Sequence, residues 1–542
     1  MSSTKGQSTN NTKAVAIVSN PVKWEDLPDP EVIRVGEVYY MSVSSFAFSP
    51  GAPILQSSNL ADWEYIGHSV PELSFGERFY LDGQHGGAYG KGIWASTLRY
   101  RKSNGLFYWY GPIQGTERTY IYTAKDPKDT WTPLPPVDKF YYDLGLLIDE
   151  DDTFYLAYGT KTISVATLSA DGLKEVVYSS DEYLEGARMY NIKGAYYIWL
   201  TRPYGGQYVL KSTSGPLGPY ECRCVIGNVL SPIPGAGSPH QGALIDTPDG
   251  KWYYMAFMDG FPAGRAPVLA PVTFDDEGWP KVEVDHSVPP GVWRTEYPLP
   301  IGTGCRKSQN SCFKTHYFDG DALEPCWEWN HNPDNSKWSI QEGRLILSTG
   351  TITKNLHLAT NTLTHRTIGP KSTATFYLDF SRLKDGDRAG VSIFRTNSAY
   401  IGIHKDTGAS RLVYAEDMVH APINIPVGWM NGHPVALDWT AQSEGTIKAE
   451  ASIAGKRVWL RIKADVSPAF SDGYEKETRF TTFEYSIDGQ NFSQLGPAFA
   501  VSTDALGYVG YRFAVFNWAT ISLGGQLLVE SCDIQSCNDY IG

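Results

Sequence analysis

An aromatic pair that follows a short turn recurs five times in the first half of the chain, and this repeat constrains the fold more than any other feature. The pairs are Tyr39-Tyr40, Phe107-Tyr108, Phe154-Tyr155, Tyr196-Tyr197 and Trp252-Tyr253, and their second members lie 68, 47, 42 and 56 residues apart. Units of this length, each with several strands, are typical of β-propeller blades. The sequence therefore predicts an all-β fold that begins with a five-bladed β-propeller over residues 20–300. Two stacked sandwiches, the structural alternative, would not need the same pattern five times.

The composition agrees with this fold and limits the partners. Aromatic residues make up 13% of the chain and charged residues 19%, and its 53 glycines and 34 prolines suit a protein with many turns. A net charge of -13 argues against nucleic acid or an anionic membrane as a partner, because phosphates attract Lys and Arg. No stretch is long and apolar enough to cross a bilayer. We expect a monomer that binds a neutral or weakly charged ligand.

The length of 542 residues predicts more than one domain. We expect a flexible arm over residues 1–19, and a linker over residues 301–315, within a region rich in Pro, Gly and Ser. Residues 316–542 contain many stretches of alternating apolar residues, which predict an antiparallel β-sandwich of the jelly-roll type. The seven cysteines contain no paired CxxC motif and no CxxC with a spaced histidine pair, so their spacing does not predict a zinc site.

Five residues occupy an equivalent position in the repeat, 11 to 14 residues before the second aromatic of each pair. They are Asp29, Trp94, Asp143, Glu185 and His240. The innermost strands of a propeller surround one axis, so positions at the starts of these strands converge at one end of it. Three carboxyl groups and an imidazole there suit either a hard cation such as Ca²⁺ or the hydrolysis of a glycoside. The structural alternative is that each acid accepts hydrogen bonds from turn N–H groups.

Several stretches resemble, in order, family 43 of the glycoside hydrolases. They are NPVKWEDLPDPEVIRVGEVYY, GIWASTLRYR, YYDLGLLIDEDDTFYLAYG, LEGARMYNIKGAYYIWLTRP and GRAPVLAPVTFDDEGWP. The resemblance implies a five-bladed propeller and inversion at the anomeric carbon, with Asp29 as general base, Glu185 as general acid and Asp143 as the residue that tunes and orients the acid. It also implies a structural Ca²⁺ near His240 and no cofactor for the chemistry. The family commonly has EGP at the acid, whereas this chain has Glu185-Gly186-Ala187.

Finer details look most similar to fungal arabinoxylan-debranching members, which release L-arabinofuranose and in some cases act on doubly substituted xylose units. This resemblance implies plant cell-wall arabinoxylan as the partner. The open alternatives are a β-xylosidase acting on xylo-oligosaccharides and a non-catalytic sugar-binding propeller. The expected substrate-binding residues are Trp94, Tyr142, Arg265, Phe46, Arg202 and Gln241, although Phe46 and Tyr142 also suit packing roles. A polymeric substrate favours an extracellular location, with the signal peptide absent from the polar start MSSTKGQSTNNTKAVAIV.

The second half resembles the concanavalin-like domain that follows many family 43 propellers, through WEWNHNPDNSKWSI and KRVWLRIKAD. We expect this domain to buttress the propeller. If it instead binds sugar, Trp327, Trp329 and Trp338 are the expected contact residues.

Overall fold

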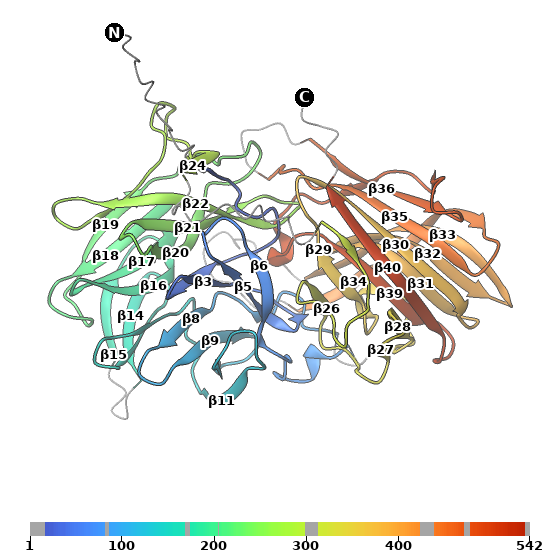
Figure 1. The fold of residues 1–542 in the computed structure, drawn as a ribbon, viewed down its shortest axis with the longest axis horizontal. Coiled ribbons are helices and arrows are strands. Elements are labelled where there is room, and N and C mark those ends of the chain that lie inside the picture. The colour runs from blue at the N-terminus through green and yellow to red at the C-terminus, as the bar shows by residue number, and fades with distance from the viewer. Residues whose placement is uncertain are drawn as a thin grey trace, which may run out of the picture.

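The computed structural model describes residues 17–81, 86–168, 174–203, 205–298, 313–422, 438–470 and 477–536. The expected arm over residues 1–19 and linker over residues 301–315 lie mostly outside these ranges. Two β-rich bodies pack side by side, with the N-terminal half in blue to green and the C-terminal half in yellow to red (Figure 1). The described helices are the short 3₁₀ segments η1 (Glu77–Phe79), η2 (Leu356–Leu358) and η4 (Leu506–Tyr508). None of the described helices is long and apolar enough to span a membrane.

The N-terminal half is a five-bladed propeller built from antiparallel sheets, as the aromatic repeat predicts. The first blade contains β2 (Glu31–Val35), β3 (Val38–Ser42), β5 (Gly51–Ser57) and β6 (Glu64–Val70). The second contains β8 (Thr97–Arg101), β9 (Leu106–Gln114), β10 (Thr119–Ala124) and β11 (Thr132–Val137), with β7 (Gly92–Ile93) also paired to β9. The third contains β12 (Gly145–Ile148), β13 (Phe154–Tyr158), β14 (Thr162–Thr167) and β15 (Lys174–Ser179). The fourth contains β16 (Glu185–Ile192), β17 (Ala195–Arg202), β18 (Gly206–Ser212) and β19 (Glu221–Ile226), and the fifth contains β20 (His240–Asp246), β21 (Trp252–Asp259), β22 (Arg265–Phe274) and β23 (Pro280–Val282).

The innermost strands β2, β8, β12, β16 and β20 contact one another in sequence, and β20 returns to β2 to close the ring. β1 (Ile17–Ser19) also pairs with β24 (Glu296–Pro298), which joins the start of the propeller to its end. Each repeated aromatic pair lies on the second strand of its blade, where its residues pack against neighbouring strands. Trp63, Trp131 and Trp279 of the blades are buried and therefore serve packing.

A buried ion cluster crosses the propeller axis below the ends of the inner strands. The fully buried Glu31 of β2 accepts a hydrogen bond from Arg99 Nη1 of β8 at 2.8 Å and lies 3.1 Å from Arg188 Nε of β16. Thr97 of β8 donates to the same carboxylate at 3.0 Å, and Arg188 also donates to the carbonyl oxygen of Leu144. Because burying an unpaired charge is costly, these contacts hold four blades in a fixed arrangement around the axis.

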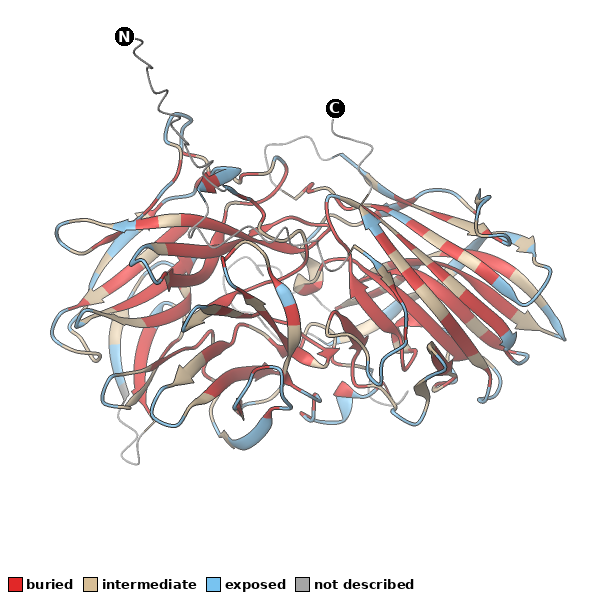
Figure 2. Cartoon of the chain, in the orientation of Figure 1, coloured by how far each residue is buried: buried red, intermediate tan, exposed pale blue. Residues whose placement is uncertain are grey.

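The C-terminal half is a β-sandwich of two antiparallel sheets, as the alternating stretches predict. One sheet contains β25 (Thr315–His316), β27 (Trp338–Gln341), β28 (Arg344–Ser348), β30 (Lys371–Arg382), β35 (Arg457–Asp465), β36 (Arg479–Ser486), β37 (Ser493–Gln494), β38 (Phe499–Val501) and β40 (Gln526–Ser536). The other contains β26 (Trp327–Asn330), β29 (Leu363–Arg366), β31 (Asp387–Phe394), β32 (Asn397–Asp406), β33 (Ala409–Pro422), β34 (Trp439–Ser452) and β39 (Arg512–Ala519). Buried and more exposed residues alternate along many of these strands (Figure 2).

The two domains share a sheet, which the sequence analysis did not foresee. β4 (Phe48–Ser49), a short strand in the connection between β3 and β5, pairs with β26 of the sandwich. Trp327 and Trp329 of β26 are 2% and 3% exposed, so they pack in the core and do not present a surface for sugar. The sandwich therefore supports the propeller through continuous hydrogen bonding, in keeping with the predicted buttressing role.

A second buried ion cluster lies at the contact between the domains. Glu328 of β26 lies 3.0 Å from Arg366 Nη1 and 2.6 Å from Arg512 Nη1, and its other oxygen is 3.2 Å from Nε2 of His68 in β6 of the propeller. Burial alone would raise the pKa of Glu328, but the charges of Arg366 and Arg512 hold it well below its usual range. The carboxylate of Glu328 therefore pairs with two buried guanidinium groups at the interface.

Glu328→Gln is expected to lower the free energy of unfolding by about 3–5 kcal/mol, because it leaves two buried guanidinium groups without their anion. Thermal or denaturant unfolding measures this loss. Glu277→Gln is the matched control, since Glu277 pairs with Arg223 on the surface, with side chains 67% and 45% exposed, and is expected to change stability by less than about 1 kcal/mol. Equal effects of the two substitutions would contradict the structural importance of the interface cluster.

Candidate active site

The predicted acids meet at one end of the propeller axis. Asp29 precedes β2, Asp143 lies just before β12 and Glu185 is the first residue of β16. The electrostatic influence of Asp29 on both Asp143 and Glu185 shows that the three carboxyl groups are near neighbours. The repeat therefore predicted their convergence correctly. Trp94 lies between β7 and β8 at the same end, and His240 begins β20.

Asp29 is only 6% exposed, and both of its carboxylate oxygens accept hydrogen bonds. Ser44 Oγ donates to Oδ2 at 2.6 Å, and Arg265 Nη1 donates to Oδ1 at 3.0 Å. Arg265 is the first residue of β22, so the fifth blade supplies the cation that faces the first blade's acid. A carboxylate held by a charged donor and a hydroxyl has a fixed orientation and can accept a proton from a water molecule.

Glu185 and Asp143 are tied together by the backbone that follows Glu185. The N–H of Gly186 donates to Asp143 Oδ2 at 3.1 Å, and Tyr142 Oη donates to Glu185 Oε2 at 3.0 Å. Gly186 has φ of 69°, and β16 is irregular between Glu185 and Arg188, so the first residues of this strand leave regular pairing. A Cβ atom at Gly186 would also lie 3.0 Å from the side chain of Gln241. Glycine at this position therefore allows Glu185 to reach the mouth of the ring while its backbone binds Asp143.

Both of these carboxyl groups are held towards the protonated form. Burial raises the pKa of Asp143 well above its usual value, and the nearby charges of Glu185 and Asp29 raise it further. Burial likewise raises the pKa of Glu185 to about 7, against the opposing hydrogen bonds from Tyr142 and Tyr183. The pair therefore retains a proton near neutral pH. Glu185 is the more exposed of the two, since Asp143 is only 5% exposed, so Glu185 is the group that can pass this proton to a ligand.

Aromatic rings from both domains form a wall beside the acids. Phe46 and Trp94 of the propeller lie 6.3 Å apart between ring centroids, and Tyr508 of the sandwich lies 6.3 Å from Phe46 and 5.6 Å from Trp94. The guanidinium of Arg265 lies 5.7 Å from the centroid of the Phe46 ring and 6.0 Å from that of Tyr508. The charges of Glu185 and Asp29 both act on Tyr508, which places its hydroxyl near the acids.

The loop that carries Tyr508 is held against the propeller by Asp26. This buried carboxylate accepts hydrogen bonds at 2.8 Å from the N–H of Arg265 and at 2.8 Å from the N–H of Gly510. Tyr511 N–H donates to the carbonyl oxygen of Pro262 at 3.1 Å. Gly510 leaves no room for a side chain, because a Cβ atom there would lie 2.0 Å from the carbonyl oxygen of Ala263. The sandwich therefore completes the site, in addition to supporting the propeller.

Five residues of this site have a strained, left-handed backbone conformation. Asp29, Phe46, Asp143, Gln241 and Tyr508 have φ values between 42° and 59°, a region that residues other than glycine seldom occupy. Such conformations cost about 1–3 kcal/mol each and persist where the surrounding structure fixes them, most often at functional sites. The positions of these side chains are therefore set by the packed blades and by the contact between the domains.

The other predicted residues differ in their placement. Gln241 is buried beside Gly186, close to the acids. Arg202 is exposed and lies 3.2 Å from Glu182, so the structure places it on the surface rather than among the pocket residues. Its neighbour Thr201 pairs with Glu185, and because successive strand residues face opposite sides, Arg202 turns away.

The surroundings of His240 offer a limited set of metal ligands. Nδ1 of His240 lies 2.9 Å from the carbonyl oxygen of Ser238, and Nε2 lies 3.8 Å from Oδ2 of Asp259. That oxygen of Asp259 is buried and has no hydrogen-bond partner among the described residues. One imidazole and one carboxylate fit a cation that keeps most of its water ligands, but not one enclosed by protein oxygens.

Neither the repeat nor the family resemblance identified some residues of the site. Ser44 and Asp26 have no repeat position that marks them, and Tyr508 lies in a different domain. Tyr183, which hydrogen-bonds to Glu185, stands two residues before the acid, and this proximity is the one signal that could have identified it.

Comparison with known proteins agrees with this geometry. Residues 18–280 match the family described as Glycosyl hydrolases family 43, and residues 315–525 match the Beta xylosidase C-terminal Concanavalin A-like domain. A solved structure of an engineered GH43 glycoside hydrolase that displays both endo-xylanase and exo-arabinofuranosidase activity is 43% identical to this chain. It covers 96% of this chain and 100% of its own, with a TM-score of 0.88.

Two further relatives differ in the activity for which they are named. A Beta-xylosidase from Formosa agariphila is 28% identical and covers 94% of this chain and 89% of its own length. A non-reducing end alpha-L-arabinofuranosidase from Bacteroides ovatus is 27% identical and covers 69% of this chain and 73% of its own length. The mixture does not specifically support the expected resemblance to fungal arabinofuranosidases. The matched domains and the 43% identity over the whole of a solved relative show that this chain belongs to glycoside hydrolase family 43.

Proposed function

We propose that this protein is an inverting, exo-acting hydrolase that releases L-arabinofuranose from the side chains of arabinoxylan, including those on doubly substituted xylose units. Glu185 donates a proton to the glycosidic oxygen as the bond to the sugar breaks. Asp29 removes a proton from the water molecule that attacks the anomeric carbon from the opposite face. Asp143 shares the retained proton of the pair with Glu185 and orients Glu185 through the N–H of Gly186.

The observation that carries this proposal is the contrast between the environments of the acids. Asp29 faces the guanidinium of Arg265, whereas Asp143 and Glu185 share a buried region in which burial raises the pKa of each. The cation beside Asp29 favours its ionised form, which suits a general base. The proton retained by Asp143 and Glu185 suits a general acid that acts on the same bond. The aromatic wall of Phe46, Trp94 and Tyr508 suits the apolar face of a small sugar ring.

The test is to incubate the protein with wheat arabinoxylan and to identify the released sugar by chromatography. Free arabinose, with the xylan backbone left intact, is the expected result. Singly and doubly substituted oligosaccharides then show whether Tyr142, at the rim beside Glu185, contacts a second substituent. Release of xylose alone would overturn the proposed specificity, and release of no sugar would overturn the proposed hydrolase activity on this polymer.

The second candidate activity is that of a β-xylosidase on xylo-oligosaccharides. It is favoured by the Beta-xylosidase relative, which matches nearly the whole chain. The same acids would act, and only the fit of the sugar would differ. Release of xylose from the non-reducing end of xylobiose, at a rate above that of arabinose from arabinoxylan, would favour this candidate.

Tyr508→Ala is expected to lower kcat/KM by about 10- to 100-fold, because the aromatic contact it removes is worth roughly 1.5–3 kcal/mol. Steady-state kinetics on the preferred substrate measures the change. Tyr508→Phe, which retains the ring, is the matched control and is expected to keep most of the activity. An unchanged kcat/KM in a folded Tyr508→Ala variant would show that the sandwich does not contribute to sugar binding.

A structural Ca²⁺ beside His240 is part of this proposal, supported by the buried oxygen of Asp259 that has no hydrogen-bond partner among the described residues. Because the described residues offer few ligands, the ion would be bound mainly through water molecules. It would hold the imidazole of His240 in place and would have no part in proton transfer. Treatment with EGTA is expected to lower the Tm, and added Ca²⁺ is expected to restore it. A Tm that is insensitive to both would remove the ion from the account. We also propose that the protein acts outside the cell, because the polymeric substrate cannot enter a cell intact. We propose that it acts as a monomer.

A further inference from the structure

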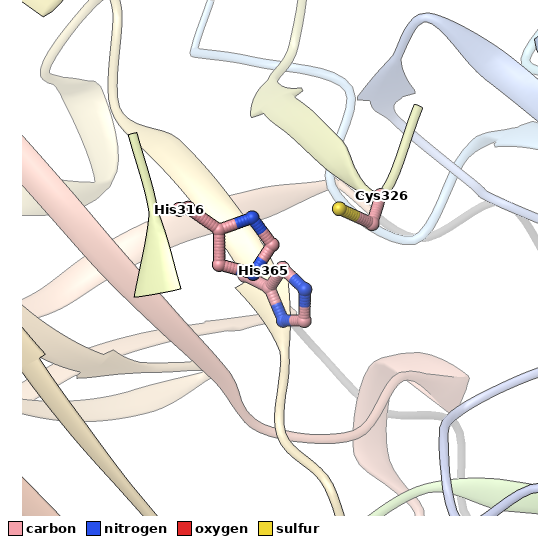
Figure 3. A group of neighbouring side chains, drawn as sticks. All are labelled: His316, Cys326 and His365. Atoms are coloured by element: carbon pink, nitrogen blue, oxygen red, sulfur yellow. The ribbon is translucent and has the colours of Figure 1, made fainter. Parts of the chain in front are cut away.

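A cluster of two imidazoles and one thiol lies in the sandwich, away from the active-site acids. His316 is on β25, His365 is on β29, and Cys326 stands immediately before β26. Each residue offers one ligand atom, and these atoms all lie within 4.8 Å of one another. Figure 3 shows the sulfur of Cys326 directed towards the two histidine rings, which lie close together. His316 is 2% exposed, His365 0% and Cys326 7%, so the cluster is buried.

Each of the two histidines has one ring nitrogen that forms a hydrogen bond and one that forms none among the described residues. Nδ1 of His316 lies 2.7 Å from Oε2 of Glu324, and Nδ1 of His365 lies 2.8 Å from the carbonyl oxygen of Arg366. Because both partners accept hydrogen bonds, each Nδ1 carries the hydrogen and each Nε2 has a lone pair. Both Nε2 atoms are buried and have no hydrogen-bond partner in the described part of the chain. Buried polar atoms are seldom left in this state.

This arrangement has the features of a metal site. A histidine that binds a metal through one nitrogen usually donates its other N–H to a carboxylate or a backbone carbonyl group, as His316 and His365 do. Glu324 lies 3.8 Å from the sulfur of Cys326 and is partly exposed, so it faces the cluster from the solvent side.

A cavity borders one side of the cluster. A cavity of about 140 Å³ is lined by His316, Leu323, Glu324 and Trp327, next to the cluster. Trp327 packs against both rings, with centroid distances of 5.4 Å to His316 and 5.1 Å to His365. The cavity therefore lies against His316 and Glu324 and has room for water molecules.

We propose that His316, Cys326 and His365 form a binding site for a borderline-soft divalent cation, Zn²⁺, with a water molecule as the fourth ligand. Thiolate and imidazole are the ligands that Zn²⁺ prefers, at bond lengths of about 2.0–2.3 Å. These lengths place tetrahedral ligand atoms about 3.4–3.6 Å apart, so side-chain movements of about 1 Å close the site. The site escaped prediction because its residues come from three separate segments and lack a CxxC motif.

The proposed ion would link the two sheets of the sandwich. β25 belongs to the sheet that contains β40, whereas β29 belongs to the sheet that β4 of the propeller joins. Metal bound between them would fasten the first strand of the sandwich to the sheet that contacts the propeller. Metal binding is therefore expected to raise the stability of the protein and to leave the hydrolytic site unchanged.

The experiment uses the full chain, stripped of metal with a chelator, dialysed and then titrated with Zn²⁺ or Co²⁺. Elemental analysis is expected to find about one Zn²⁺ per chain, and Co²⁺ is expected to give a thiolate charge-transfer band together with the intense visible bands of tetrahedral coordination. Zn²⁺ is expected to raise the Tm by about 5 °C. Cys326→Ser and His365→Gln are expected to lose the band, the bound metal and the shift in Tm.

The matched controls are Cys224→Ser and His286→Gln, which remove an exposed thiol and an exposed imidazole elsewhere and are expected to retain all three signals. Metal binding that persists in Cys326→Ser would mark an adventitious ion only and would overturn the proposal. Absence of a thiolate band in the wild-type protein, or oxidation of Cys326 to a disulfide in a thiol assay, would also overturn it. The wild-type Co²⁺ spectrum decides the question even if a variant fails to fold.

Discussion

Glu185→Gln is expected to lower kcat by about 10³- to 10⁴-fold on a natural glycoside while leaving the fold intact. Gln matches Glu in shape but has no acidic proton to give to the leaving oxygen. The loss should shrink strongly on an aryl glycoside whose phenolate leaves without protonation. Steady-state rates on the two substrates measure this difference. Glu182→Gln is the matched control, since Glu182 is an exposed carboxylate only three residues away that pairs with Arg202.

The pH dependence of the wild type checks the same role with a defined sign. The acid must be protonated to act, and burial raises the pKa of Glu185 to about 7, so kcat is expected to fall as the pH rises through that region. Glu185→Gln should abolish this alkaline limb. Equal losses on natural and activated substrates, with the alkaline limb retained, would show that Glu185 is not the proton donor.

Asp29→Asn is expected to lower kcat by about 10³-fold or more on both kinds of substrate. The amide cannot accept a proton from the attacking water, and a better leaving group does not compensate for that defect. Asn also leaves the guanidinium of Arg265 without the carboxylate that it contacts at 3.0 Å. Kinetics on the natural and the aryl glycoside, with circular dichroism to confirm folding, measure the effect.

The control for this substitution is Asp246→Asn, because Asp246 pairs with Arg34 at the other end of an inner strand. It is expected to leave kcat unchanged. A loss in Asp29→Asn that disappears with an activated leaving group would assign Asp29 to leaving-group protonation, which contradicts its proposed role as the base.

The sequence was sufficient for the parts of the site that follow the repeat. Asp29, Asp143 and Glu185 could be found because each blade repeats the same pattern, and a closed ring places equivalent strand ends together. Arg265 was identified through the family resemblance, and the structure places it against Asp29. Each of these residues lies at or near the start of a strand, and such a position can be recognised from the sequence.

Contacts between the domains could not be predicted in this way. Asp26 and Gly510 are 484 residues apart, and their hydrogen bond depends on how the sandwich packs against the propeller. Tyr508 reaches the acids only through this packing, and β4 pairs with β26 for the same reason. Arg202 was misplaced because the sequence does not show which face of β17 meets the acid when β16 has a bulge at its start.

The most direct test of the central claim is the anomeric configuration of the first sugar released by the wild-type protein, followed by proton NMR before mutarotation mixes the anomers. Attack by a water molecule that Asp29 activates on the face opposite Glu185 predicts a product whose configuration is inverted relative to the substrate. A first product with retained configuration would require a covalent sugar–enzyme intermediate and would contradict the roles assigned to both residues.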